Sequence, residues 1–352
     1  MTRTCALAAK ILATNVKRLS FPYKLTLIVT YNCNLRCRMC NIWQRPVSNE
    51  FTLDEYERFF SRSHDFNWVN MSGGEIFLRR DLLDIVKIIT SRCRDLYLLD
   101  FPTAGLMTGK VIETVGAILR LNIKKVLVTV SMDGPPRLHD EIRGVPGAWE
   151  KATDTFLELR KMSSKKFGVY FGVTISGFNQ DALFDTVAAL TQKIPGLTYR
   201  DIHVNIAHLS SHYYGNDARI AAEHRKVIDV INAFRRAKGR PWLHPVLALE
   251  DYYLKKAPQY IRTGKRPLCC QALESSVFID PHGDVFPCSI YDRKLASLRD
   301  VDYDLAAIWN SENARRLRAE IVQGACPHCW TPCEAYQSIF AHLFPYRAMT
   351  GT

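Results

Sequence analysis

The sequence lacks several features that would assign it to a class at once. No apolar run approaches the length of about 18 residues that a membrane-spanning helix requires, so we expect no transmembrane segment. The amino terminus lacks the pattern of a cleaved signal peptide, and we find neither an internal repeat nor a low-complexity segment. Without a secretory signal, the 11 cysteines indicate metal binding in a reducing, cytoplasmic setting rather than a disulfide framework.

Acidic residues are in the minority. The chain has 47 Lys and Arg against 35 Asp and Glu, which gives a formal charge of +12. This excess favours an anionic partner, namely a phosphorylated or carboxylated substrate, RNA or a membrane surface, although it also fits a plain role in solubility. At 352 residues and 47% hydrophobic content, the chain is long enough for one large domain with an appendage or for two domains.

The order of apolar segments predicts an α/β fold. Residues 3–19 have the pattern of an amphipathic helix, which we expect to pack against the core, with a membrane surface as the alternative. Strands and helices then alternate, as in βαβ units with a parallel sheet. The expected strands are 24–30, 67–71, 96–101, 126–131, 169–175 and 202–206, and the expected helices between them are 51–60, 81–92, 110–120, 149–162 and 181–192.

Polar segments follow five of these strands. Because active sites of such folds lie at the carboxyl ends of the strands, we predict that these segments build a single site. The segments are 33–40, 72–75, 103–105, 131–134 and 176–179. A further group near the sixth strand fits substrate contacts and ordinary loop positions equally well, and it comprises His203, His208, His212, Tyr213 and Tyr214.

Three cysteines define the first of these segments. Cys33, Cys37 and Cys40 form a CxxxCxxC spacing directly after an apolar strand. Soft thiolates at this spacing can hold three corners of an iron–sulfur cluster. No fourth cysteine follows closely, so one iron would stay open, as in catalytic metal sites. A zinc knuckle and a disulfide pair are the alternatives, but zinc usually takes four ligands in CxxC pairs.

A second cysteine set appears after residue 239, where the alternation of strands and helices stops. We expect a helix over 247–261, interrupted at Pro258, and then a hairpin that turns at residues 281–283. One cysteine precedes the hairpin, one follows it, and a CxxC pair with one more cysteine lies further along. By spacing alone these thiolates fit zinc or an iron–sulfur cluster. The candidates are Cys270, Cys288, Cys326, Cys329 and Cys333.

The first cysteine loop resembles that of the radical S-adenosylmethionine (radical SAM) enzymes. The resemblance implies that S-adenosylmethionine chelates the open iron of a 4Fe–4S cluster, and that its reductive cleavage gives a 5′-deoxyadenosyl radical, which abstracts a hydrogen atom. Met39 stands where the family usually has an aromatic residue. The resemblance implies cofactor-binding roles for Met39, Ser72, Gly73, Gly74, Glu75, Thr103, Ser131 and Arg143.

Motifs of the family carry these roles. Residues 72–75 match its Gly-Gly-Glu element, whose glycines allow a close backbone approach and whose carboxylate accepts from the cofactor's amino group. Residues 103–105 stand where the family often has Thr-Asn-Gly, so Ala104 loses a side-chain contact. Ser131 and Arg143 match a serine and an arginine of a longer pattern, and an arginine fork suits a carboxylate. A surface salt bridge is the alternative for Arg143.

The second cysteine set resembles the auxiliary-cluster domain of the SPASM/Twitch branch of the same superfamily. Only Cys333 remains beyond the four cysteines of the hairpin and the CxxC pair, which implies one auxiliary 4Fe–4S cluster. Cys270 fits the family spacing to Gly283 better than Cys269, although its neighbour could substitute. Cys333 is a further candidate ligand, with a substrate-facing or structural thiol as alternatives.

Together the resemblances imply a partial (β/α)6 TIM-like barrel with a small cysteine-rich domain at its carboxyl end. We expect an amino-terminal helix over 1–20, a radical SAM core over 21–238, a linker helix over 239–266 and a Twitch/SPASM-like domain over 267–345.

An auxiliary cluster implies an outlet for the electron of a substrate radical. We therefore expect an oxidoreductase acting on a small anionic, sugar or lipid-linked substrate, with flavodoxin or ferredoxin as electron donor and peripheral membrane contact as an option. A maturase of ribosomally made peptides is the alternative within the class. A non-catalytic zinc or iron–sulfur nucleic-acid binder is the alternative outside it, but the chain lacks an aromatic–basic binding motif, so we expect no nucleic acid. No residue is assigned as acid or base.

Overall fold

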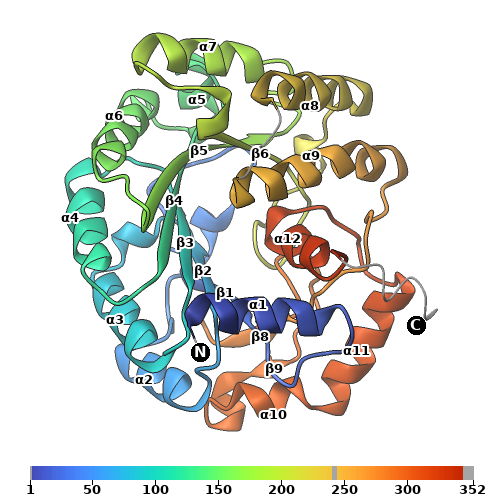
Figure 1. Ribbon diagram of the computed structural model, residues 1–352. Helices are drawn as coiled ribbons and strands as arrows, with labels where there is room; N and C mark the ends of the chain where they lie inside the picture. Colours follow the sequence, from blue (N-terminus) through green and yellow to red (C-terminus); the bar gives the residue numbers. More distant parts are fainter. Residues whose placement is uncertain (1, 240–243, 344–352) are drawn as a thin grey trace.

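The computed structural model describes residues 2–239 and 244–343. Six parallel strands form its centre, and each pairs with the next along the chain (Figure 1). This is the α/β arrangement that the alternation of segments predicted. The strands are β1 (Lys24–Thr30), β2 (Trp68–Gly73), β3 (Leu98–Thr103), β4 (Lys125–Ser131), β5 (Phe167–Ile175) and β6 (Ile202–Ile206).

Helices cover the outer side of these strands (Figure 1). Burial alternates along β4 and β5, because successive side chains of a strand point to opposite faces and one face packs on the helices. In β1, which lies between β2 and β7, all seven residues are buried, so both of its faces are covered. The covering helices are α2 (Leu53–Arg62), α3 (Leu82–Arg92), α4 (Thr108–Leu119), α6 (Ala148–Lys161) and α7 (Leu183–Lys193).

Helix ends were predicted less well than strands. All six expected strands are present, but α1 (Arg3–Thr14) ends before residue 19, because the side chains of Thr14 and Asn15 both bond the Ile11 carbonyl. The short α5 (Pro136–Arg143), which begins with a proline and ends at a left-handed glycine, was not predicted.

The expected break at Pro258 was wrong. α9 (Pro245–Thr263) continues through this proline, because the buried face around Tyr253, Leu254 and Ile261 offsets the hydrogen bond that proline cannot donate. The helix packs against α8 (His224–Lys238), which was not predicted either.

The carboxyl-terminal part continues the same sheet. The expected hairpin is confirmed, with β7 (Ser276–Ile279) and β8 (Asp284–Phe286) antiparallel. Unexpectedly, β7 also pairs in parallel with β1, and β8 pairs with a short β9 (Ala296–Ser297). In the described part of the chain, the strands of this sheet therefore run in the order β6-β5-β4-β3-β2-β1-β7-β8-β9. The helices that follow are α10 (Leu305–Trp309), α11 (Glu312–Gln323) and α12 (Pro332–Phe340).

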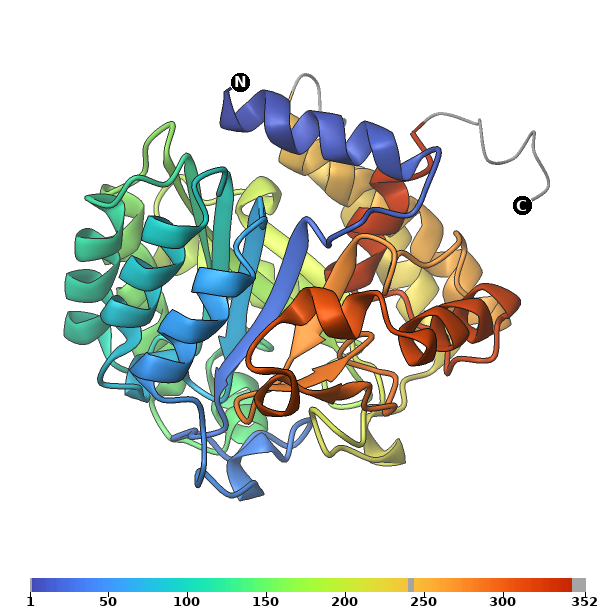
Figure 2. The same cartoon turned by 90° about the horizontal axis from the view of Figure 1, so that it is seen from below.

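Helix α1 packs against the core, as the sequence predicted. Leu7 and Ile11 pack against a buried cluster that includes Tyr23 and Trp68 near the starts of two strands, and Phe340 of α12 packs against the same cluster. Figure 2 shows α1 across the end of the barrel that lies opposite the loops following the strands. Among the residues that the structure describes, no helix is both long and apolar enough to span a membrane.

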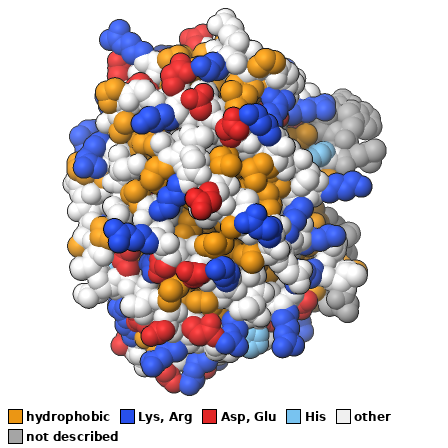
Figure 3. All heavy atoms as spheres, turned by 90° about the vertical axis from the view of Figure 1, so that its left-hand side faces the viewer, with side chains coloured by type: hydrophobic (Ala, Val, Ile, Leu, Met, Phe, Trp, Pro, Cys, Tyr) orange, Lys and Arg blue, Asp and Glu red, His pale blue; other side chains and the backbone are white. Residues whose placement is uncertain are grey.

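The excess positive charge is not gathered on the face shown in Figure 3, where basic and acidic side chains are interspersed. Basic and acidic side chains also pair within the outer helices, as in Lys87–Asp84 of α3 and Lys161–Glu158 of α6. That face therefore gives no support to a nucleic-acid-binding surface.

Candidate active site and auxiliary cysteine cluster

Loops at the carboxyl ends of the strands surround one cavity of about 210 Å³. Every residue predicted to hold S-adenosylmethionine or its cluster borders it. These residues are Cys33, Cys37, Met39, Cys40, Ser72, Gly73, Gly74, Glu75, Thr103, Ser131 and Arg143. The segment 176–179 lies behind the wall instead, where Asn179 donates to the Asp133 carbonyl at 2.9 Å.

The unpredicted helix α5 holds the cysteine loop in place. Arg36 N donates to Arg143 O at 3.0 Å, and Arg38 N donates to Ile142 O at 2.8 Å. The loop packs so closely here that a Cβ on Gly144 would lie 2.7 Å from the Arg36 oxygen. The end of α5 therefore helps to fix the position of Cys37, which lies between Arg36 and Arg38.

The three loop thiols are poor acids in the protein alone. Burial raises the pKa of Cys33 to about 11 and that of Cys40 to about 12, and it also raises the pKa of Cys37. Thiolate ligands at these positions need a positive charge that the surrounding side chains do not fully supply. A metal centre supplies it, because coordination deprotonates a thiol outright. The donor set therefore fits an iron–sulfur cluster.

Two glycines bring the Gly-Gly-Glu segment onto the cysteine loop. Gly74 N donates to Thr30 O at 2.9 Å, and Glu75 N donates to Asn32 O at 2.8 Å. A Cβ on Gly74 would lie 2.2 Å from the Asn32 oxygen and 2.8 Å from the Cβ of Cys33. No larger residue fits here without moving the loop.

Glu75 is held as a fixed acceptor at the cavity wall. Its carboxylate accepts from Thr103 Oγ1 at 3.0 Å and from Ala104 N at 2.7 Å. Burial raises its pKa, although these hydrogen bonds favour the ionised form. The backbone of Ala104 thus orients Glu75, even though its side chain lacks the amide that is common at this position in the family.

Arg143 forms a buried ion pair with Asp133 rather than the surface salt bridge that was the alternative. Burial opposes its charge, but Asp133 and Cys37 outweigh that effect and raise the pKa of the guanidinium. Nη1 lies 3.8 Å from the Cys37 sulfur. Its buried Nε has no hydrogen-bond partner among the described residues, so the side chain retains a donor for a ligand carboxylate.

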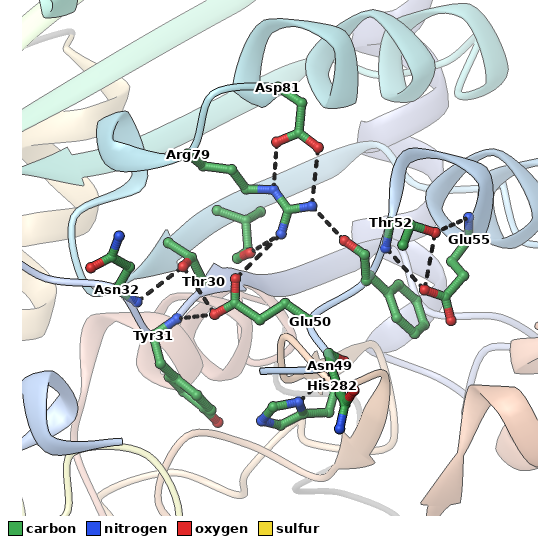
Figure 4. Close-up of polar contacts among 12 residues, drawn as sticks. Thr30, Tyr31, Asn32, Asn49, Glu50, Thr52, Glu55, Arg79, Asp81 and His282 are labelled. Atoms are coloured by element: carbon green, nitrogen blue, oxygen red, sulfur yellow. Dashed lines mark hydrogen bonds and ion pairs between the residues drawn. The ribbon is translucent and has the colours of Figure 1, made fainter. Parts of the chain in front are cut away.

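A second polar network lies behind the start of the cysteine loop (Figure 4). Glu50 accepts from Thr30 Oγ1 at 2.9 Å and from Tyr31 N at 2.7 Å. Arg79 lies 3.6 Å from Glu50, pairs with Asp81 at 2.8 Å, and donates to the Val29 carbonyl at 2.6 Å. Because these bonds hold the backbone at the end of β1, they fix the point at which the cysteine loop begins.

Four cysteines of the second set border another, smaller cavity. They are Cys270, Cys288, Cys326 and Cys329. Cys269 is absent from this lining, as the family spacing suggested. The sulfurs accept from Ala272 N at 3.4 Å (Cys270), from Tyr291 N at 3.3 Å (Cys288) and from Arg266 Nη1 at 3.1 Å (Cys326). Such donors stabilise thiolates, so this set also fits a cluster.

Cys333 lies apart from these four. It does not border their cavity, and its carbonyl accepts from the buried ammonium of Lys24. Its ligand role stays a prediction. Within the described residues, no three or more His, Cys, Asp or Glu side chains are arranged to hold a single metal ion.

The histidines and tyrosines near β6 divide into two groups. His208, Tyr213 and Tyr214 border the first cavity, whereas His203 and His212 do not. His208 Nε2 accepts from Trp330 N at 3.0 Å, so its Nδ1 carries the proton that is donated to Ile206 O at 2.7 Å. Burial lowers its pKa to about 4. This ring joins the barrel to the segment beside Cys329.

Sequence reasoning missed several residues that contribute to these sites. Tyr213, already a candidate from the sequence, bonds Ser72 through the two hydroxyls at 2.9 Å. The missed residues are Asn205, Asn216 and Thr331, which border the first cavity. None of them belongs to a spacing motif. Only the rule that polar residues at the carboxyl ends of parallel strands share one edge could have indicated Asn205, which lies near the end of β6.

Comparisons with known proteins agree with this geometry. Residues 27–190 match the radical SAM superfamily, and residues 269–330 match the SPASM iron–sulfur cluster-binding domain. The chain belongs to the radical SAM superfamily and is an enzyme. More specifically, it carries the SPASM domain, and the two domains imply a SAM-binding 4Fe–4S cluster, an auxiliary 4Fe–4S cluster and S-adenosylmethionine as its cofactors.

Individual relatives are distant. The AdoMet-dependent heme synthase of Oleidesulfovibrio alaskensis is 24% identical, over 86% of this chain and 78% of that protein. The subtilosin biosynthesis protein AlbA of Bacillus subtilis is 23% identical, over 88% of this chain and 64% of that protein. The structure of Streptococcus suis SuiB bound to S-adenosylmethionine has a TM-score of 0.60 at 15% identity, over 88% of this chain and 70% of that one. It supports the fold.

Proposed function

We propose that this enzyme abstracts a hydrogen atom from its substrate and then oxidises the substrate radical through the auxiliary cluster. The observation that carries the proposal is the convergence of the three loop cysteines, the Gly-Gly-Glu segment, Ser131 and Arg143 on one cavity. When bound there, the cluster and S-adenosylmethionine supply one electron and the 5′-deoxyadenosyl group that accepts the hydrogen atom.

The chain's own residues would place the cofactor. Cys33, Cys37 and Cys40 would bind three irons and leave the fourth open. Glu75, which Thr103 and Ala104 hold in position, would accept from the cofactor's ammonium group. Arg143 would donate to its carboxylate, and Asp133 keeps that guanidinium oriented.

The position of the auxiliary cysteines supports an oxidation. A third cavity, of about 380 Å³, shares Ile206, Ala207 and His208 with the first cavity, and shares Ile290, Pro327 and His328 with that of the auxiliary cysteines. A substrate between them could lose a hydrogen atom on one side and an electron on the other. With the release of a proton, this is a two-electron oxidation of the substrate.

The substrate class stays open between two candidates. A small anionic, sugar or lipid-linked molecule is our first candidate, supported by the net charge of +12. A ribosomally made peptide is the second, favoured by the names of relatives such as the mycofactocin maturase MftC of Mycolicibacterium smegmatis and by the complex of SuiB with its precursor peptide. We further propose flavodoxin or ferredoxin as electron donor, peripheral membrane contact as an option, and a cytoplasmic location, since all 11 cysteines are free.

The test is made on anaerobically reconstituted, reduced protein. We expect the wild type to form 5′-deoxyadenosine from S-adenosylmethionine, and the variant Cys33→Ala/Cys37→Ala/Cys40→Ala to form none while it keeps about half of the iron. A wild type that carries zinc and forms no deoxyadenosine would sink the proposal.

A second arm tests the auxiliary site with a matched pair of neighbours. Cys270→Ala should lose the auxiliary iron, whereas Cys269→Ala should keep it, because only Cys270 borders the cavity of the four cysteines. Equal iron contents in the two variants would contradict this assignment.

A further inference from the structure

Arg266 lies at the edge of the auxiliary cysteine cavity, two residues after the end of the linker helix at Gly264. Its Nη1 donates to the Cys326 sulfur at 3.1 Å and lies 3.4 Å from His328 Nδ1. Its Nη2 donates to the carbonyls of Ile321 at 2.5 Å and Val322 at 3.0 Å. The guanidinium is therefore anchored to the last turn of α11 and points its other nitrogen at a cysteine sulfur.

The charge of Arg266 is not cancelled by a partner. No carboxylate in the described part of the chain forms an ion pair with it, in contrast to Arg318, which pairs with Glu274 at 2.6 Å. A positive charge that donates to a ligand sulfur stabilises the more negative, reduced form of a cluster. Hydrogen bonds to the sulfurs are among the factors that set the potential of an iron–sulfur cluster.

We propose that Arg266 is a positioning residue that raises the reduction potential of the auxiliary cluster through its hydrogen bond to Cys326. The inference rests on the proposed function, in which the four cysteines hold that cluster. The inference also assigns the cluster the role of electron acceptor, because a higher reduction potential makes it a better acceptor for the electron of a substrate radical. Arg266 borders neither the first cavity nor the third.

The test isolates the auxiliary cluster in the variant Cys33→Ala/Cys37→Ala/Cys40→Ala and follows its reduction by electron paramagnetic resonance during a potentiometric titration. Arg266→Gln should shift the reduction equilibrium by about tenfold towards the oxidised form, which is about 59 mV downwards for a one-electron couple. Arg266→Lys, which keeps the charge without the fork, should shift it in the same direction by less. Arg262→Gln is the matched control, because it removes the same charge from an exposed position on α9.

Each outcome bears on one claim. A potential in Arg266→Gln equal to that of Arg262→Gln, with the cluster intact, overturns the inference and leaves the proposed function in place. If Arg266→Gln assembles no cluster, the lysine variant decides, and an unshifted potential there overturns the inference as well. If the parent variant carries no auxiliary iron at all, the proposed function fails instead.

Discussion

At the scale of single residues, the site depends on the close contact between the backbone of the Gly-Gly-Glu segment and that of the cysteine loop. Gly74→Ala would place a Cβ 2.2 Å from the Asn32 oxygen and would push the cysteine loop away from the Gly-Gly-Glu segment. We expect at least about a tenfold loss of deoxyadenosine formation, which corresponds to about 1.4 kcal/mol, with the auxiliary iron retained. The control is Gly109→Ala in α4, whose Cβ meets nothing within 4 Å. Wild-type activity in Gly74→Ala would contradict the required contact.

His139 makes stability depend on pH. Its Nδ1 accepts from Asp133 N at 3.1 Å, and burial together with the nearby Arg143 lowers its pKa to about 3. The unfolded ring titrates near its ordinary value of about 6.5, so only the unfolded state gains a proton just below that pH. The free energy of unfolding should therefore fall as the pH drops from about 6.5 towards 3, by about 1 kcal/mol at pH 5.5.

The variant His139→Asn tests this dependence. Its side-chain oxygen can accept the same hydrogen bond but does not titrate. Denaturant unfolding at pH 7.5 and 5.5 should show a smaller loss of stability in the variant than in the wild type. An equal loss of stability between pH 7.5 and pH 5.5 in both proteins would show that His139 does not cause the pH dependence.

At the scale of elements, the network of Figure 4 joins the end of β1 to the loops before α2 and α3. Only 12% of the Glu50 side chain and 10% of the Arg79 side chain are exposed. Glu50→Gln keeps the size of the side chain but leaves Arg79 without this partner. We expect it to lower the free energy of unfolding by about 1–3 kcal/mol and to weaken binding of S-adenosylmethionine.

Glu141→Gln is the matched control for Glu50→Gln. It makes the same chemical change in the exposed Arg137–Glu141 pair of α5, which should contribute less than about 1 kcal/mol. Chemical denaturation and equilibrium binding of S-adenosylmethionine measure both variants. Equal stabilities in the two would show that the network does not fix the loop.

The elements also show what the sequence could reveal. The alternation of apolar runs predicted all six strands of the barrel, because each run is buried and is followed by polar residues. It did not predict α5, since its sequence has few apolar positions and only Ile142 and His139 are buried. The cysteine spacings predicted two sets of thiols, of which Cys33, Cys37 and Cys40 border one cavity and four of the second set border another. The contact of Arg266 with Cys326 depends on tertiary packing that no local pattern encodes. The pairing of β7 with β1 is equally non-local.

At the scale of the whole molecule, one hydrophobic core spans both parts of the chain. The same buried cluster contains Leu25 of β1, Ile279 of β7 and Ile339 of α12. We therefore expect a single cooperative unfolding transition, in which loss of cluster absorbance and loss of helical circular dichroism coincide. Two separated transitions, with the barrel outlasting the cysteine-rich part, would contradict this expectation.

The parallel pairing of β1 with β7 has a consequence for how a substrate reaches the interior. A hinge between the barrel and the cysteine-rich part would have to break the backbone hydrogen bonds between Leu25–Leu27 and Val277–Ile279, all of which are buried. Opening by separation of the two parts is therefore costly, so we expect the spacing between the two cysteine sites to stay constant during turnover. We expect the substrate instead to enter and leave between the loops beyond the strands, and movement of these short loops to set the rate of turnover.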